Sequence, residues 1–88
     1  NLSVEYLFDI FPKNYECPML KTPMEWGGNN SNSPSLDCII PDLRYIKENV
    51  AWISTKANTS KGTRSPEKLR KIADWADSAA EKAGLKHE

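Results

Sequence analysis

The chain of 88 residues contains little histidine, little cysteine and no long apolar run. One histidine, His87, and two cysteines, Cys17 and Cys38, are too few for a four-ligand zinc site unless carboxylates or a second chain contribute. The cysteines also lack the density of a secreted disulfide scaffold, so we expect a reducing, intracellular setting. No apolar segment approaches the roughly 20 residues that a membrane-spanning helix needs, so we expect no membrane partner.

The length of the chain limits how much core it can bury. With 88 residues, 39% of them hydrophobic and 27% charged, the composition is ordinary for a globular chain, and we expect a single domain over residues 1–88. Domains of this size often draw extra stability from a metal, a disulfide or a partner. The sequence starts at Asn1 rather than Met, which leaves open that it is part of a longer chain with a flanking domain.

The formal net charge is zero, but the charges are unevenly distributed. Between positions 56 and 71 the only acid is Glu67, whereas several acids collect in the first 25 residues. The basic residues of this region are Lys56, Lys61, Arg64, Lys68, Arg70 and Lys71. One basic region on a neutral body is a plausible footprint for a polyanion, although on charge alone a solvated helix face is the simpler interpretation.

Caps and prolines divide the first half of the chain into short elements. Ser3 can cap a helix whose apolar residues recur at helical spacing, and Pro12 ends it, so we expect an N-terminal helix docked on the core. The prolines between Cys17 and Trp26 indicate two short extended pieces around a turn, which would form a small extra hairpin. The polar segment 27–34 that follows is expected to be a flexible loop.

The central part of the chain predicts the order strand, strand, helix. The β-favouring runs 36–40 and 50–53 are separated by a loop, so we expect an antiparallel pair with a wide turn. Ser54 can cap a short helix through Lys61, and Gly62 can end it because glycine tolerates left-handed backbone.

A longer helix is predicted at the C-terminal end. Ser65 followed by Pro66 is typical of a helix start, and the apolar stripe that follows predicts a helix over about 66–83. We expect Trp75 to help clamp this helix onto the core. The aromatic residues in general are interpreted as core or hairpin packing rather than base stacking; they include Trp26, Tyr45, Trp52 and Trp75.

Two oxygen-bearing side chains are candidates for holding a hydrolytic metal. Asp37 would come from the first strand and Asn58 from the short helix, so that one charged and one neutral oxygen ligand meet across the small interior. Such an incomplete set leaves coordination positions for water and phosphate, which suits Mg²⁺ or Mn²⁺ better than a structural zinc. Taken singly, either residue would usually be an ordinary surface group.

The motif residues resemble those of a known enzyme family. The segment 36–41, Leu-Asp-Cys-Ile-Ile-Pro, is similar to the hydrophobic-Asp-His-Ile-Ile-Pro opening of HNH endonucleases of the ββα-metal (His-Me finger) superfamily. Asn49 resembles the central Asn of that motif, Asn58 follows it at the interval of the last metal ligand, and Lys61 with Gly62 closes it. The match runs from about position 17 to 75 and looks most like the small HNH-like endonucleases of bacteriophages.

This resemblance implies an α+β fold with a ββα-metal core over about 17–62 and a metal-dependent DNA endonuclease activity, with nicking or double-strand cleavage and weak sequence specificity. It implies that Asp37 and Asn58 hold Mg²⁺ or Mn²⁺, that Asn49 orients the base or braces the loop, and that Lys61 meets phosphate. Two copies could pair, or a flanking DNA-binding domain could supply specificity. A phage-encoded enzyme would act in the host cytoplasm.

Cys38 stands where the family usually keeps its histidine base. An ordinary thiol is mostly protonated at working pH, whereas imidazole titrates near it, so the water-activating group is left open. Metal-bound water or the substrate phosphate could suffice, Cys38 could serve weakly, or this copy could be catalytically impaired. Relatives of the phage group often carry arginine at this position. His87 lies at the far end of a predicted tail and is an unpromising replacement.

Three basic residues besides Lys61 are predicted to contact DNA. Arg44 lies in the loop between the strands, next to the proposed metal, where it could pair with phosphate or with Asp42. Lys56 and Arg64 belong to the basic region. Ribbon and helix are expected to approach the minor groove and read backbone shape. The alternatives are an impaired scaffold that only binds nucleic acid, and a zinc-bound structural module through Cys17 and Cys38.

Overall fold

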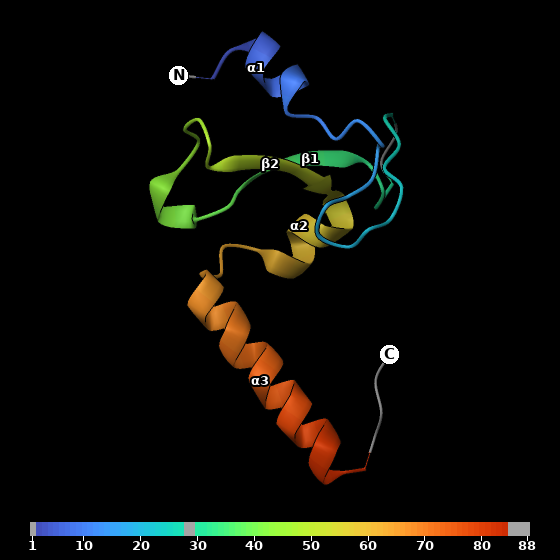
Figure 1. Cartoon of the computed structure of the whole chain (residues 1–88), viewed down its shortest axis with the longest axis vertical. Helices are drawn as coiled ribbons and strands as arrows, with labels where there is room; N and C mark the ends of the chain where they lie inside the picture. Colours follow the sequence, from blue (N-terminus) through green and yellow to red (C-terminus); the bar gives the residue numbers. More distant parts are fainter. Residues whose placement is uncertain (1, 28–29, 85–88) are drawn as a thin grey trace.

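Each α-helix of the described residues is preceded by a capping serine, as the sequence predicts. The computed structural model describes residues 2–27 and 30–84, so Gly28, Asn29 and His87 lie outside the described residues. The elements are α1 (Val4–Asp9), β1 (Pro34–Cys38), a 3₁₀ turn (Pro41–Leu43), β2 (Val50–Ser54), α2 (Thr55–Lys61) and α3 (Pro66–Lys82). The fold is a small α+β arrangement in which a short helix precedes an antiparallel hairpin and two further helices (Figure 1).

Local hydrogen bonds explain where the helices start and stop. The hydroxyls of Ser3, Ser54 and Ser65 each accept the backbone N–H three residues later, at 3.0, 3.1 and 3.2 Å. Each bond satisfies one of the N–H groups that a helix start leaves without a partner. α2 ends before Gly62, whose φ of +58° is costly for other residues. The predicted caps of all three helices are confirmed.

β1 and β2 form the only sheet in the part of the chain that the structure describes. They pair antiparallel, from Pro34 opposite Ser54 to Cys38 opposite Val50. The first strand is expected at 36–40, but β1 begins and ends two residues earlier, at Pro34–Cys38. The ladder ends early because the side chain of Asn49, rather than a strand backbone, bonds the N–H and C=O of Ile40, at 2.9 and 3.0 Å.

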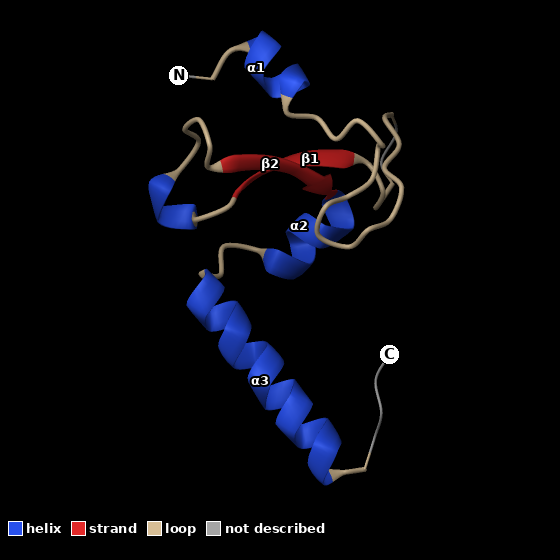
Figure 2. Ribbon diagram, viewed as in Figure 1, coloured by secondary structure: helices blue, strands red, loops and turns tan. Residues whose placement is uncertain are grey.

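α1 and α2 lie on opposite sides of the hairpin (Figure 2). On the α2 side, a small core is formed by Cys17, Met24, Ile53 and Ala57. On the α1 side, the indole N–H of Trp52 donates to the carbonyl of Leu7 at 2.7 Å. The N-terminal helix therefore contacts the hairpin, but none of its residues is buried in the core.

An aromatic cluster joins the segment after α1 to the hairpin. The ring of Phe11 lies 5.1 Å from Tyr15, 5.1 Å from Trp26 and 5.8 Å from Trp52, between ring centroids. Aromatic pairs at such distances add stability beyond their buried area. The packing role predicted for Trp26 and Trp52 is confirmed. The same prediction is wrong for Tyr45, which is 59% exposed on the loop between the strands.

The predicted extra hairpin is shorter than expected. In this segment the structure contains a single bridge, Glu16 opposite Pro23, together with a bond from the Cys17 N–H to the carbonyl of Thr22 at 2.8 Å. Proline has no N–H to donate, so a regular ladder cannot continue through this segment. The turn is present, and its role is to bring Cys17 under the hairpin.

α3 leaves the body of the protein instead of packing on it (Figure 1). None of its residues is buried, and the side chain of Trp75 is 72% exposed. The expectation that Trp75 clamps this helix to the core is therefore wrong. The apolar stripe of α3 consists mostly of alanine, which offers little area to bury, and the 62–65 connection directs the helix outward.

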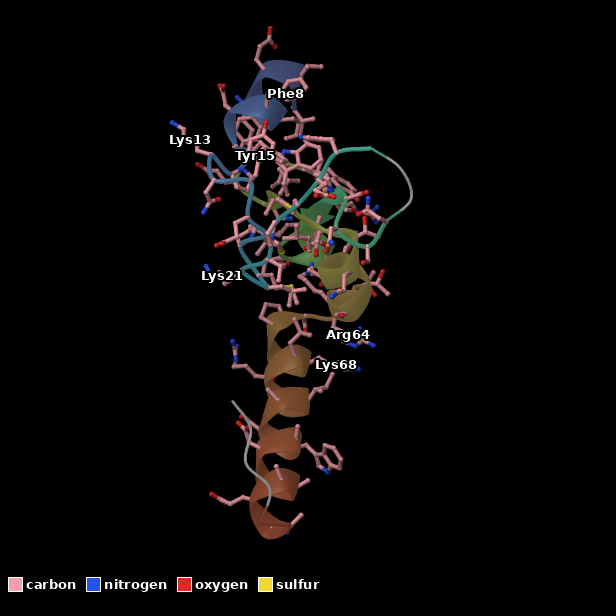
Figure 3. All side chains as sticks on the ribbon, turned by 90° about the vertical axis from the view of Figure 1, so that its right-hand side faces the viewer. Phe8, Lys13, Tyr15, Lys21, Arg64 and Lys68 are labelled. Atoms are coloured by element: carbon pink, nitrogen blue, oxygen red, sulfur yellow. The ribbon has the colours of Figure 1, made fainter. Side chains whose placement is uncertain are left out.

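The projecting helix makes the molecule elongated. Its extents are 48 × 27 × 21 Å, and its radius of gyration is 15.2 Å. A compact chain of this length would have a radius of about 12 Å. Side chains stand out around α3 without a neighbouring element (Figure 3). None of the helices in the described residues is long and apolar enough to cross a bilayer.

Candidate active site between β1 and α2

Two side-chain to side-chain contacts connect β1 to α2. The ammonium Nζ of Lys61 lies 3.1 Å from Asp37 Oδ2, and Asn58 Nδ2 donates to Ser35 Oγ at 2.8 Å. Ser35 and Asp37 are two positions apart on a strand and therefore share a face. Asn58 and Lys61 are three positions apart on a helix and share a face too. The alternation of the strand and the turn of the helix thus assemble the site.

The carboxylate of Asp37 is unusually well buried for a charged group. Its side chain is 11% exposed, and that of Lys61 is 12% exposed. Removing one partner of a buried ion pair typically costs about 3–5 kcal/mol, because the other charge is left without compensation. Asp37 is therefore held in place by a cation that belongs to the protein itself.

A hollow of about 560 Å³ opens at this junction. Four of the predicted site residues line it, namely Asp37, Cys38, Arg44 and Asn58. Asp42, the alternative partner considered for Arg44, lines it as well. The structure thus brings together the two predicted metal ligands, the residue at the base position and one predicted phosphate contact.

Asn49 lies behind the hollow as a buried brace. It is 5% exposed, and its Nδ2 donates to the carbonyls of Ile40 and Arg44, at 3.0 and 2.6 Å. Its Oδ1 accepts the N–H of Ile40 at 2.9 Å. Of the two roles expected for Asn49, these contacts match the bracing of the loop between the strands.

The loop holds Arg44 in a strained backbone conformation. Its φ is +62° and its ψ is −161°, a combination that residues other than glycine rarely adopt. The carbonyl of Arg44 accepts Asn49 Nδ2 and the N–H of Ile46, which keep it there. Such strain is common where a side chain must be presented at a functional site. The backbone of Arg44 is consequently fixed at the edge of the hollow, and the residue is exposed there.

Cys38 is half-buried and is a free thiol. It follows Asp37 at the end of β1, and its backbone carbonyl accepts the Lys61 ammonium at 2.9 Å. Its position beside the carboxylate agrees with the place that the motif gives to a base. The structure contains no histidine among residues 2–27 and 30–84 that could take this role instead.

Cys17 belongs to the core and not to this site. Its Sγ accepts the N–H of Ser54 at 3.4 Å and that of Leu20 at 3.5 Å. Burial would raise the pKa of the Cys17 thiol, but these N–H donors outweigh it and place the pKa below its ordinary value.

A zinc module through both cysteines does not fit this geometry. Ser54, which bonds Cys17, is at the opposite end of the hairpin from Cys38, roughly 13 Å away at about 3.3 Å per strand residue. In the described part of the chain, no three side chains of the types His, Cys, Asp and Glu gather in one place. The interpretation of Cys17 and Cys38 as joint zinc ligands is therefore wrong.

The other predicted phosphate contacts differ in their surroundings. Lys56 is exposed on α2. Arg64 is exposed too, but its Nη1 donates to the carbonyls of Ser60 and Lys61, at 3.0 and 3.1 Å, and so caps the end of α2. Arg64 lies in the connection between α2 and α3, and Lys68 lies near the start of α3 (Figure 3).

Sequence reasoning missed two features of this site. It did not foresee that Ser35 bonds Asn58, although the two-residue spacing from Asp37 places both on one face of the strand. It also assigned Lys61 to phosphate alone, whereas the structure pairs it with Asp37. No signal in the sequence shows which of the nearby cations lies against the carboxylate.

Compared with known protein families, with curated proteins and with solved structures, the chain matches none of them.

Proposed function

We propose that this protein is a divalent-metal-dependent DNA endonuclease of the HNH type, similar to the small enzymes of bacteriophages. The observation that carries this proposal is the meeting of Asp37 and Asn58 at one hollow, from a strand and a helix in ββα order. Asn49 braces the adjoining loop from its motif position. Together these residues support a ββα-metal core.

The donor atoms at the hollow suit Mg²⁺ or Mn²⁺. Asp37 offers a carboxylate, and Asn58 can turn its amide oxygen to the ion because its Nδ2 is already engaged by Ser35. Hard oxygen ligands and several remaining water positions are what these ions prefer. The position of Lys61 against Asp37 also marks the site as a place for positive charge. When bound, the ion would acidify a water and offset the charge that develops on phosphate.

The protein residues around the hollow would position the DNA. Arg44 at the edge can bind a phosphate through two parallel N–H donors, which fixes the strand relative to Asp37. Lys56 and Arg64 are exposed and add positive charge, as do the basic residues at the start of α3. Contacts to phosphates alone give weak sequence preference. Nicking or double-strand cleavage, in the second case by a homodimer, is compatible with this surface.

Cys38 leaves the base step weaker than a histidine would. General base catalysis typically contributes about 10²–10⁴-fold, so the loss of imidazole slows hydrolysis without abolishing it. We expect a slow enzyme. Replacing Cys38 by histidine restores the usual residue at a position that already borders the hollow, and we expect cleavage to become faster.

Conversion of supercoiled plasmid to nicked and linear DNA tests this proposal. Native protein with Mg²⁺ or Mn²⁺ should cleave, and EDTA, Asp37→Asn or Asn58→Ala should abolish cleavage. Asp74→Asn, at an exposed carboxylate on α3, is the matched control and should cleave like the native chain. Full activity of folded Asp37→Asn would show that the site is assigned wrongly.

The ion pair between Lys61 and Asp37 favours one alternative. Because Asp37 is already compensated by a protein cation, the scaffold is complete without a metal, as an impaired copy that only binds nucleic acid would be. Such a module predicts DNA binding that weakens with salt and ignores chelator. DNA binding without cleavage at high protein concentration would support this alternative.

A further inference from the structure

Lys61 differs from every other lysine of the basic region. Its ammonium lies between Asp37 Oδ2 at 3.1 Å and the carbonyl of Cys38 at 2.9 Å, and its side chain is 12% exposed. Lys56, one turn and a half earlier on the same helix, is exposed to solvent. The charge of Lys61 is therefore paired within the protein and is not available to a DNA phosphate in this conformation.

We propose that Lys61 is a built-in competitor of the divalent metal: it holds Asp37 until the metal displaces it, and it turns to the DNA phosphate only then. This inference rests on the proposed function, since it concerns the affinity of that same site. It makes Lys61 a positioning residue that sets how tightly the site binds metal and couples metal binding to DNA binding.

Electrostatics explains why both cations cannot remain at Asp37. An ammonium at 3.1 Å from Oδ2 would lie next to a divalent ion on the same carboxylate, and like charges at such distances repel strongly in a poorly solvated site. The affinity of the free protein for metal is therefore lowered by the work of moving Lys61.

The chemistry of lysine makes displacement feasible. Its ammonium is a single charge on a flexible four-carbon stem, unlike the planar fork of arginine, which would hold a carboxylate through two bonds. Lys61 is the last residue of α2, and Gly62 and the exposed Thr63 follow, so its side chain can swing into the hollow without disturbing a packed element. The hollow is lined by Asp37 and by Thr63, so this path leads toward the proposed DNA site.

Charge balance predicts that DNA strengthens metal binding. Asp37 and Lys61 neutralise one another, so a divalent ion alone leaves the site with two excess positive charges. A DNA phosphate compensates part of this excess and gives the displaced ammonium a new partner. Because binding linkage is reciprocal, metal must strengthen DNA binding by the same factor, and both effects should shrink when Lys61 loses its charge.

Mn²⁺ binding to the full chain in the absence of DNA, measured by titration with electron paramagnetic resonance, tests the inference. We expect Lys61→Met to bind Mn²⁺ about tenfold more tightly than the native chain, within the range of ordinary coupling between sites. Lys56→Met, which removes the same charge from the exposed face of α2, should change the affinity far less. Asp37→Asn should abolish binding.

The outcomes separate the two proposals. If native chain and Lys61→Met bind Mn²⁺ equally, or the variant binds more weakly, the competitor role is overturned while the metal site survives. If neither protein binds Mn²⁺, the metal site itself is absent and both proposals fail. Because Lys61→Met leaves the buried carboxylate without a hydrogen-bond donor, Lys61→Gln, which removes the charge but keeps a donor, is a second variant. Mn²⁺ should raise its melting temperature more than that of the native chain.

Discussion

The body of the protein and helix α3 start from similar sequence signals but end in different states. α2 and α3 both begin at a serine cap and both carry apolar residues. Ala57 of α2 is fully buried against Cys17 and Ile53, whereas α3 has no buried residue. A cap therefore decides that a helix forms, but only contact with another element decides whether it contributes to the core.

The difference lies in the area that each helix can bury. α2 is clamped by hydrogen bonds at Asn58 and Lys61 and directly follows β2, so it cannot leave the hairpin. α3 is separated from α2 by residues 62–65, and its stripe is rich in alanine. Ile72 and Trp75 of α3 consequently remain 50% and 72% exposed.

The largest expected contrast concerns apolar truncation in the two regions. Met24→Ala removes a side chain that is 3% exposed and should lower the free energy of unfolding by about 2–5 kcal/mol. Ile72→Ala, at a position 50% exposed on α3, should change it by less than about 0.5 kcal/mol. Denaturant unfolding of both variants measures the difference. A loss of similar size in both would mean that α3 is buried in solution, for example in a homodimer.

Substituting Asn49, which braces the loop between the strands, should lower the free energy of unfolding nearly as much as truncating a core residue. Asn49→Ala removes two donated bonds and one accepted bond and leaves the carbonyls of Ile40 and Arg44 without this partner. We expect a loss of about 2–3 kcal/mol, within the range for a buried hydrogen-bonding group. Cleavage should fall as well, because Arg44 loses its support. Asn14→Ala, which removes one exposed hydrogen bond to the Glu16 N–H, is the control and should cost less. Native-like stability of Asn49→Ala would refute the bracing role.

Substitution of tryptophan should give a smaller difference in stability between the two regions. Trp52→Phe keeps an aromatic ring but removes the indole N–H that donates to the Leu7 carbonyl. The expected cost is about 1 kcal/mol, as for one hydrogen bond. Trp75→Phe on α3 should have no measurable effect on unfolding. Thermal unfolding followed by circular dichroism distinguishes them; equal melting temperatures of Trp52→Phe and the native chain would argue against the docking of α1.

The smallest expected effect is a pH dependence of the free energy of unfolding, which comes from Cys17 in the body of the protein and not from α3. The pKa of Cys17 is below its ordinary value, so its thiolate contributes stability that is present above the ordinary thiol pKa and is lost as the pH falls through the lowered one. Unfolding free energy should therefore rise slightly from neutral to mildly alkaline pH. Cys17→Ala should remove this rise, and an identical pH profile in that variant would contradict the assignment.

Most of the secondary structure was predictable, and the exceptions have identifiable causes. The helix starts at Ser3, Ser54 and Ser65 depend on bonds to the N–H three residues away, which the sequence displays directly. The strand is predicted to continue to position 40, but β1 ends at Cys38 because the side chain of Asn49, nine residues beyond Ile40, bonds the backbone of Ile40. The bounds of the C-terminal helix, Pro66–Lys82, agree with the expected 66–83. Its expected packing on the core is wrong, because none of its residues is buried.

At the candidate site, the sequence by itself determined which residues are available. The two-residue period of β1 and the helical turn of α2 bring Asp37 and Asn58 to one hollow once the ββα order is present. Only the tertiary structure decided that Lys61, 24 positions after Asp37, is the cation against the carboxylate, and that α3 stays outside the core. Local hydrogen bonds and periodicity act between neighbours in the chain and can be read there. Ion pairing and burial depend on which distant groups share a small volume, and that is settled only when the chain has folded.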